Sequence, residues 1–125
     1  MAGRTEPGGL SRLLAACLAL ALGGCGKSTA EWVEQLRAKD SALRLRAVKA
    51  LGERGGEVEV VVPALAGALK DSDPFVRRDA ARALGKLGAR ARPAAPALVA
   101  ALRDRSPAVR KAAAEALGKV DPSGR

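Results

Sequence analysis

Side chains capable of covalent or acid–base chemistry are few in this sequence and unevenly placed. Histidine is absent, which removes the commonest general base and a common metal ligand. The two cysteines, Cys17 and Cys25, lie in the first quarter of the chain and cannot hold the remainder together by a disulfide. A zinc site needs about four ligands, usually Cys and His, and the chain after Cys25 has neither. We therefore expect no catalytic residues, no metal, no cofactor and no enzyme activity.

Two short motifs imitate ligand sites. Residues 21–28 read A-x-x-x-x-G-K-S, close to the phosphate-binding loop G-x-x-x-x-G-K-[ST]. A nucleotide-binding enzyme also needs a second strand that ends in a metal-binding Asp, whereas the rest of this chain predicts helix pairs. Residues 71–73 (Asp-Ser-Asp) resemble the start of a calcium loop, but its twelfth position would be Arg82, where a Glu is required. We interpret both motifs as structural, with Asp73 as a helix cap.

The first 28 residues have the pattern of an export signal. Arg4 and Arg12 precede an uncharged apolar run at residues 13–22, and small residues follow at 23–26. A basic start, a short apolar run and a small-residue end are typical of secretory signal peptides. The run is too short for a membrane-spanning helix, which needs about 20 residues. Two alternatives stay open: a signal peptide cut elsewhere, and a buried helix of a cytosolic protein.

The sequence Leu22-Gly23-Gly24-Cys25 resembles the lipobox of bacterial lipoproteins. In that family the cysteine receives a diacylglyceryl group, the chain is cut before it, and the new amino terminus is usually acylated too. The resemblance implies a signal peptide at residues 1–24, lipidation at Cys25 and a short tether at 25–28. It further implies a protein of the bacterial cell envelope, lipid-anchored on the periplasmic or surface side of a membrane, because several acyl chains anchor firmly.

Beyond residue 28 the sequence repeats with a constant offset and without a gap. The columns that keep one residue type include Leu36, Leu69 and Leu102; Arg44, Arg77 and Arg110; Ala47, Ala80 and Ala113; and Gly52, Gly85 and Gly118. Periods of 20–50 residues indicate stacked supersecondary units. The chain is therefore predicted to contain three such units.

Each unit is predicted to consist of two helices. Pro63 and Pro96 suit the first position of the first helix, where a missing N–H costs nothing. The pairs at 73–74 (Asp-Pro) and 106–107 (Ser-Pro) suit the N-cap and first position of the second helix. Residues 58–62 alternate like a strand but have no partner strand, so we interpret them as the start of a helix or as a loop.

Residues 63–85 read P-A-L-x-x-A-L-x-D-x-D-P-x-V-R-x-x-A-A-x-A-L-G, residues 96–118 follow this pattern closely, and residues 30–52 follow it loosely. The pattern resembles the HEAT repeat, in the short variety named after phycobilisome lyases. The resemblance implies an all-α fold over residues 29–125, a short α-solenoid of three two-helix HEAT-like repeats. It also implies that the second helices line a concave face, a common binding surface in such solenoids.

The repeated arginines border the apolar stripe of the second helices. In HEAT-like families an arginine here resembles a ladder residue that bonds an Asp in a turn of a neighbouring unit. For Arg44, Arg77 and Arg110, the resemblance offers Asp40 and Asp73 as carboxylates. The alternative for these arginines is contact with a ligand.

A second stripe on these helices is charged and lies off the apolar face. Its basic members are Lys49, Arg78, Arg82, Lys86, Lys111 and Lys119. It is either a solvated helix face or a basic surface for an acidic protein partner. The formal net charge of +9 would also suit nucleic acid. Export and the near absence of aromatics for base stacking argue against nucleic acid.

These inferences together predict a membrane-anchored, non-catalytic module for protein–protein interaction or scaffolding. The third unit shows no separate cap, so its open end is expected to be a face for self-association or for a partner. Two alternatives stay open. One is a bilin-lyase-like enzyme, which the repeat variety resembles by name; the other is a cytosolic HEAT-like nucleic-acid binder, if the amino terminus is not exported.

Overall fold

The computed structural model describes residues 26–124, so the signal peptide and the lipidation site predicted at Cys25 lie outside the described residues. The elements in chain order are α2 (Thr29–Gln35), α3 (Ser41–Gly52), α4 (Val58–Ala68), α5 (Pro74–Leu87), the 3-10 helix η2 (Gly88–Ala94), α6 (Ala95–Ala101) and α7 (Pro107–Val120). No strand occurs between residues 26 and 124. The predicted all-α class and the short solenoid of helix pairs are confirmed.

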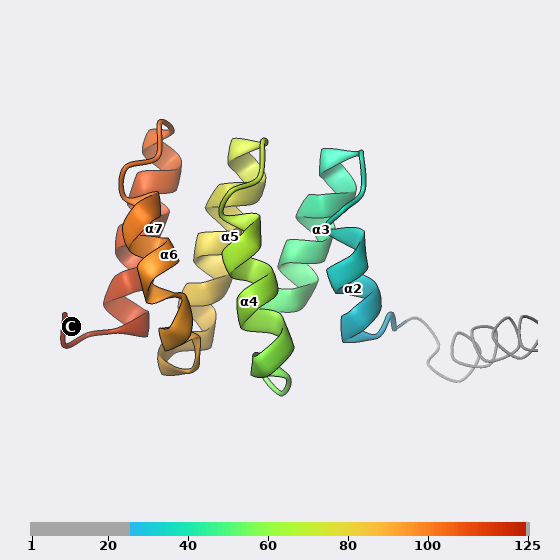
Figure 1. The fold of residues 1–125 in the computed structure, drawn as a ribbon, viewed down its shortest axis with the longest axis horizontal. Helices are drawn as coiled ribbons and strands as arrows, with labels where there is room; N and C mark the ends of the chain where they lie inside the picture. The colour runs from blue at the N-terminus through green and yellow to red at the C-terminus, as the bar shows by residue number, and fades with distance from the viewer. Residues whose placement is uncertain (1–25, 125) are drawn as a thin grey trace, which may run out of the picture.

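The helices form two layers (Figure 1). In that view α2, α4 and α6 lie in front, α3, α5 and α7 lie behind, and successive pairs stand side by side along the long axis. The core fills the space between the layers and between the pairs. Its largest fully buried side chains are Leu51, Leu65, Leu84, Leu98, Val48, Val61, Val76, Val109 and Val120. This core is aliphatic throughout, as the shortage of aromatic residues requires.

The repeated glycine lets neighbouring second helices approach closely. A Cβ added at Gly52 would lie 2.7 Å from the Cβ of Ala83, so α3 and α5 pack with no room for a side chain there. A Cβ added at Gly85 would lie 3.2 Å from the Cα of Ala116 on α7. Small residues on both sides of each junction therefore set the spacing between units.

The second helices begin where their caps predict. The side chain of Asp40 accepts a hydrogen bond from the N–H of Ala42, and that of Asp73 accepts one from the N–H of Phe75. Ser106 occupies the N-cap of α7 without a side-chain cap bond. The cap role predicted for Asp73 is confirmed, and satisfying the first N–H groups in this way stabilises a helix by about 1 kcal/mol.

The start of the first helices differs from prediction. Helix α4 begins at Val58, so Pro63 lies inside it and not at its first position. The earlier start buries Val61 and Val62 in the core, which outweighs the backbone hydrogen bond that Pro63 cannot donate. In the third unit the corresponding stretch is the 3-10 helix η2, and Pro96 is the second residue of α6.

Among residues 26–124, no helix combines the length and the apolarity that crossing a bilayer would require.

Candidate functional site

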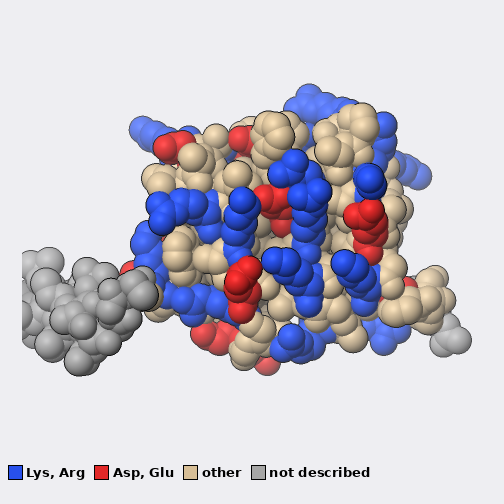
Figure 2. Space-filling model, turned by 180° about the vertical axis from the view of Figure 1, so that it is seen from behind, with Lys and Arg blue, Asp and Glu red and all other residues tan. Residues whose placement is uncertain are grey.

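The predicted basic stripe of the second helices forms one surface of the molecule (Figure 2). Seen from behind the view of Figure 1, Lys and Arg side chains gather over the layer of α3, α5 and α7. We call this surface the basic face and define it by Lys49 from α3, Arg78, Arg82 and Lys86 from α5, and Lys111 and Lys119 from α7. The structure thus brings together all six residues singled out from the sequence.

The basic face is hollowed along both junctions between its helices. A groove of about 310 Å³ between α3 and α5 is lined by Lys49, Arg82 and Lys86. Two grooves follow the junction of α5 with α7. One, of about 450 Å³, has Arg78, Arg82 and Lys111 as its basic lining residues, and the other, of about 240 Å³, has Arg82, Lys86 and Lys119. Glu115 is the acidic residue that lines both. Arg82 borders all three grooves and is the central residue of the face.

A buried carboxylate forms ion pairs with the two arginines of the face. The side chain of Asp79 is 7% exposed, and its Oδ1 lies 3.0 Å from Nε of Arg78 and 3.7 Å from a terminal nitrogen of Arg82. Arg78 also lies over the ring of Phe75, 5.2 Å from its centroid. Sequence reasoning missed Asp79 because its column is not repeated: Arg46 and Ala112 occupy the equivalent positions.

The remaining cations of the face give it surplus positive charge. Lys86 has an exposed ion pair with Glu53, with 3.4 Å between Nζ and Oε2, and such pairs contribute little. Across residues 26–124, no ion pair involves Lys49, Lys111 or Lys119. Guanidinium and ammonium groups bind carboxylate and phosphate oxygens best. The face can therefore bind an anionic ligand or an acidic protein surface.

Two arginines of the repeated column, Arg44 and Arg77, link consecutive units. Arg44 donates from Nε and from a terminal nitrogen to the two carboxylate oxygens of Asp71, at 2.8 and 3.0 Å. Arg77 donates to Asp104 with the same two distances. A third nitrogen of each arginine donates to backbone carbonyls of the arginine's own unit. Each arginine thus ties its own turn to the turn of the next unit.

These bonds shift the pKa of one arginine, Arg44, and of one carboxyl group, Asp104. The pKa of Arg44 is raised, mainly by the hydrogen bond to Asp71. Burial raises the pKa of Asp104, but the hydrogen bonds from Arg77 and from the N–H of Ser106 lower it, and the net pKa is lowered. Both shifts favour the charged forms.

The carboxylates of the ladder are not the ones expected from the sequence. Asp40 and Asp73, proposed as partners of the arginines, cap α3 and α5, and the arginines bond Asp71 and Asp104. Asp71 and Asp104, each two residues before an N-cap residue, bond the arginine of the preceding unit. The cap residue Asp73 instead bonds the first turn of its own helix. Arg110 lies in the same column but donates to the backbone carbonyl of Asp104.

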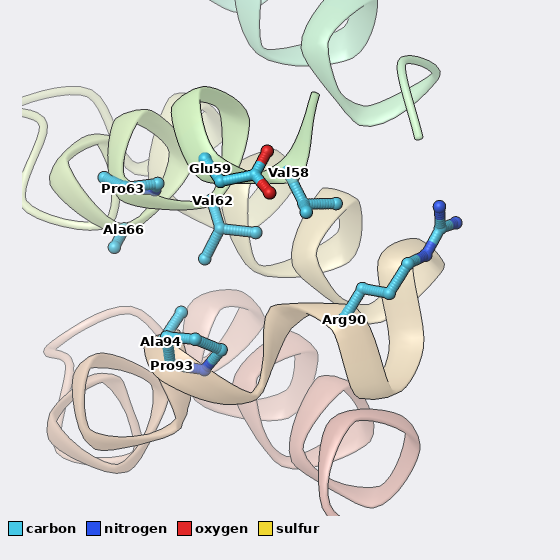
Figure 3. Close-up of a pocket in the computed structure, with 8 residues that line it drawn as sticks. All are labelled: Val58, Glu59, Val62, Pro63, Ala66, Arg90, Pro93 and Ala94. Carbon is cyan, nitrogen blue, oxygen red and sulfur yellow. The ribbon is translucent and has the colours of Figure 1, made fainter. Parts of the chain in front are cut away.

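A different hollow lies between α4 and η2 (Figure 3). It has a volume of about 440 Å³ and is mostly apolar, with Val62, Pro63 and Pro93 among its lining residues. Glu59 lies on its α4 wall, and Arg90 extends at one end, where it donates to the carbonyl of Gly55. Sequence reasoning did not predict this groove. Its walls come from two units whose first helices begin differently, so no repeated column marks it.

Comparison with known proteins identifies the repeat. A family model described as HEAT repeats matches residues 29–95, and one described as HEAT repeat matches residues 94–123. Among solved structures, the chain is similar to a chain of the complex of CpcE and CpcF of phycocyanin lyase from Nostoc sp. PCC7120, with 34% identity and a TM-score of 0.68. The match covers 76% of this chain and 38% of that chain. The search of curated proteins found no match.

This comparison corrects the expected function. The solved relative is part of a lyase, so the prediction of a non-catalytic scaffold that is not an enzyme is wrong, and the bilin-lyase-like alternative is favoured. The predicted membrane anchor is not tested by this similarity. The error came from treating the absence of His as evidence against enzyme function, although a repeat module can belong to a lyase by binding. The expectation of a protein partner agrees with a relative that is found in a two-protein complex.

Proposed function

The chain belongs to the HEAT-repeat family, and from this premise we propose that it is a bilin-lyase-like protein that works together with a second protein. The observation that carries the proposal is the similarity, over 76% of the chain, to a chain of a phycocyanin lyase complex. The chain spans only 38% of that relative, so we assign it the role of one binding module in such an assembly.

The basic face supplies the chemistry that a bilin would need. A bilin is an open-chain tetrapyrrole that carries propionate carboxylates, and guanidinium groups bind carboxylates with two parallel hydrogen bonds. Arg78, which donates a hydrogen bond to Asp79, and Arg82 border the groove of about 450 Å³, with Lys111 on the opposite helix. This volume falls within the range of about 300–1,000 Å³ that is usual for small-molecule sites.

The same face supports an acidic protein partner. Lys49 and Lys119, near opposite ends of the face, have no ion pair within residues 26–124. Their charges would attract an acidic surface over a distance of about 10 Å, the screening length at 0.1 M salt. We propose that a pigment-carrying or assembly partner presents an acidic surface to these residues.

We also propose that the protein is exported and lipid-anchored at Cys25 in the bacterial cell envelope. The support is the sequence Leu22-Gly23-Gly24-Cys25 after an apolar run. The mass of the amino-terminal peptide from membrane fractions tests this. A multiply acylated peptide that begins at Cys25 and is lost in Cys25→Ser is expected; an unprocessed peptide that begins at Met1 in the soluble fraction contradicts it.

Bilin binding tests the proposed function directly. Biliverdin is titrated into the full chain, and its binding is followed by its visible absorbance. We expect saturable binding that weakens about tenfold or more in Arg82→Ala, since a charge-assisted hydrogen bond contributes about 1.5–3 kcal/mol.

Arg37→Ala is the matched control for this titration. Arg37 is also an exposed arginine, but it follows α2 in the other layer, where it has a weak surface pair with Glu34. It should leave bilin affinity unchanged. An absence of saturable binding, or equal losses in Arg37→Ala and Arg82→Ala, would contradict the proposal.

A further inference from the structure

The described stack ends at α7 on a surface whose equivalents are buried one unit earlier. Leu69 is 5% exposed, whereas Leu102 in the same column is 37% exposed. Arg77 is 6% exposed, whereas Arg110 is exposed. Ala114, Leu117 and Gly118 are likewise more exposed than Ala81, Leu84 and Gly85. We call Leu102, Arg110, Ala114, Leu117 and Gly118 the end face.

Two recurring contacts cover this surface in the earlier units. The first is the bidentate pair between an arginine and the carboxylate of the next unit, seen for Arg44 and Arg77. The second is the close approach of a repeated glycine to an alanine of the next second helix, seen for Gly52 and Gly85. Each junction therefore has one charged contact and one small-residue contact.

Both contacts are incomplete at the end face. Within residues 26–124, no carboxylate forms an ion pair with Arg110, whose terminal nitrogen donates to the backbone carbonyl of Asp104 at 2.8 Å. A Cβ added at Gly118 would meet no atom within 4 Å among the described residues. Among residues 26–124, the half of the junction that α7 carries has no second half packed against it.

We propose that the end face docks a HEAT-like helix pair of another protein, which brings a carboxylate to Arg110 and a small residue to Gly118. Charge complementarity and continuity with the two junctions inside the chain define this occupant. The carboxylate must stand in the turn before the second helix, as Asp71 and Asp104 do. This surface lies at the end of the stack and does not depend on the proposed bilin function.

A second copy of this chain fits the end face less well. In a head-to-tail stack, the first unit of the copy would face α7, and position 38 would stand opposite Arg110. That position, which corresponds to Asp71 and Asp104, is Ala38. Burying Arg110 without a carboxylate is unfavourable, so the chemistry selects a different chain as the occupant.

The first experiment supplies the missing half within one chain. Residues 121–125 are replaced by a second copy of residues 88–120, whose own copy of Asp104 would reach Arg110. Covalent attachment gives a high effective concentration, so docking does not depend on an unknown partner. A matched extension carries Asp→Ala at the copied Asp104. Hydrogen exchange of the α7 amides is compared in the two extended chains.

We expect exchange in α7 to be at least about tenfold slower with the Asp extension than with the Ala extension, because the docked unit protects the helix. The difference should vanish when Arg110→Gln is added to both chains. Equal exchange in α7 with the two extensions would overturn the proposal that Arg110 accepts a carboxylate. Since bilin titration is a separate readout, failure here leaves the proposed function standing.

A second experiment tests the choice of occupant with the full chain alone. In sedimentation, the wild type and Arg110→Gln should behave alike, because no association of the wild type depends on Arg110. Ala38→Asp should create head-to-tail association, and adding Arg110→Gln should abolish it. Wild-type association that is lost in Arg110→Gln would overturn the choice of another protein in favour of a second copy. An Ala38→Asp chain that does not associate would overturn the role of the carboxylate.

Discussion

Helices α5 and α7 carry the same residues in most of their columns, yet α7 lacks the second neighbouring unit against which α5 packs among residues 26–124. Arg77, Leu84 and Gly85 are buried on α5, whereas their equivalents on α7 are exposed or half-buried. The difference shows that the contribution of a repeated residue to stability comes from its contacts with the next unit and not from its own helix. In such stacks, stability is a sum over units and over junctions between neighbours. Identical substitutions in the two helices should therefore have unequal effects.

The largest contrast is expected for the ladder arginines. Arg77→Ala would leave Asp104 in its half-enclosed turn without its counterion, and breaking a buried pair costs about 3–5 kcal/mol. Arg110→Ala removes an exposed side chain with no ion pair among residues 26–124 and should cost below about 0.5 kcal/mol. Urea unfolding of both variants measures the contrast, and similar losses would show that the junction does not depend on this bond.

The next contrast concerns the leucine column of the first helices. Leu69→Ala should lower the free energy of unfolding by about 2–3 kcal/mol, because a buried leucine leaves a cavity. Leu102→Ala should lower it by about 1 kcal/mol, since this side chain is already 37% exposed. The two urea midpoints are compared at equal slope. A larger loss for Leu102 would mean that the end of the stack is covered in solution.

Replacement of the repeated glycine by alanine should have opposite effects on stability at two positions of the column. Gly52→Ala should destabilise by about 1–2 kcal/mol, because the added Cβ would lie 2.7 Å from the Cβ of Ala83. Gly118→Ala should stabilise by up to about 1 kcal/mol, because it gains helix propensity and meets no described atom within 4 Å. Thermal unfolding provides the measurement. If both variants were destabilised, the space beside Gly118 would be occupied.

These contrasts also mark what the sequence could predict. The helix pairs and the caps of the second helices repeat along the chain, so local patterns sufficed to place them. Pro63 misled because its usual place at a helix start is a local preference, which the burial of Val61 and Val62 overrode. The conformational preference of a single residue sets the boundary of a helix only where tertiary packing does not favour another boundary.

The basic residues of the candidate site could be predicted from the sequence, whereas its carboxylates could not. The basic residues of the face recur at helical spacing, whereas Asp79, which pairs with two of them, occurs in one unit only. The turn before α5 offers two carboxylates, Asp71 and Asp73, and their spacing does not say which caps the helix and which reaches the neighbouring unit. That choice depends on where the preceding unit places Arg44, which only the folded stack determines.

The smallest expected effect is the dependence of the ladder on pH. The pKa of Asp104 is lowered in the folded protein relative to the unfolded value of about 3.9. Its stabilisation is therefore complete above that value and is lost as the pH falls through the folded pKa. Asp104→Asn should be less stable than the wild type at neutral pH, and the gap should narrow between about pH 5 and about pH 2.

The exposed carboxylate of Glu34 supplies the control for this measurement. Its side chain is 72% exposed and lies 3.8 Å from Arg37, a surface contact of little weight. Glu34→Gln should therefore shift the wild-type curve far less than Asp104→Asn does. The free energy of unfolding is measured with urea at each pH. If the carboxylate acted only as a hydrogen-bond acceptor for Arg77, the difference between Asp104→Asn and the wild type would be the same at every pH. If the difference in the free energy of unfolding narrows as the pH falls, the charge of Asp104 contributes to the junction. Among residues 26–124, the end face has no such charged carboxylate paired with Arg110.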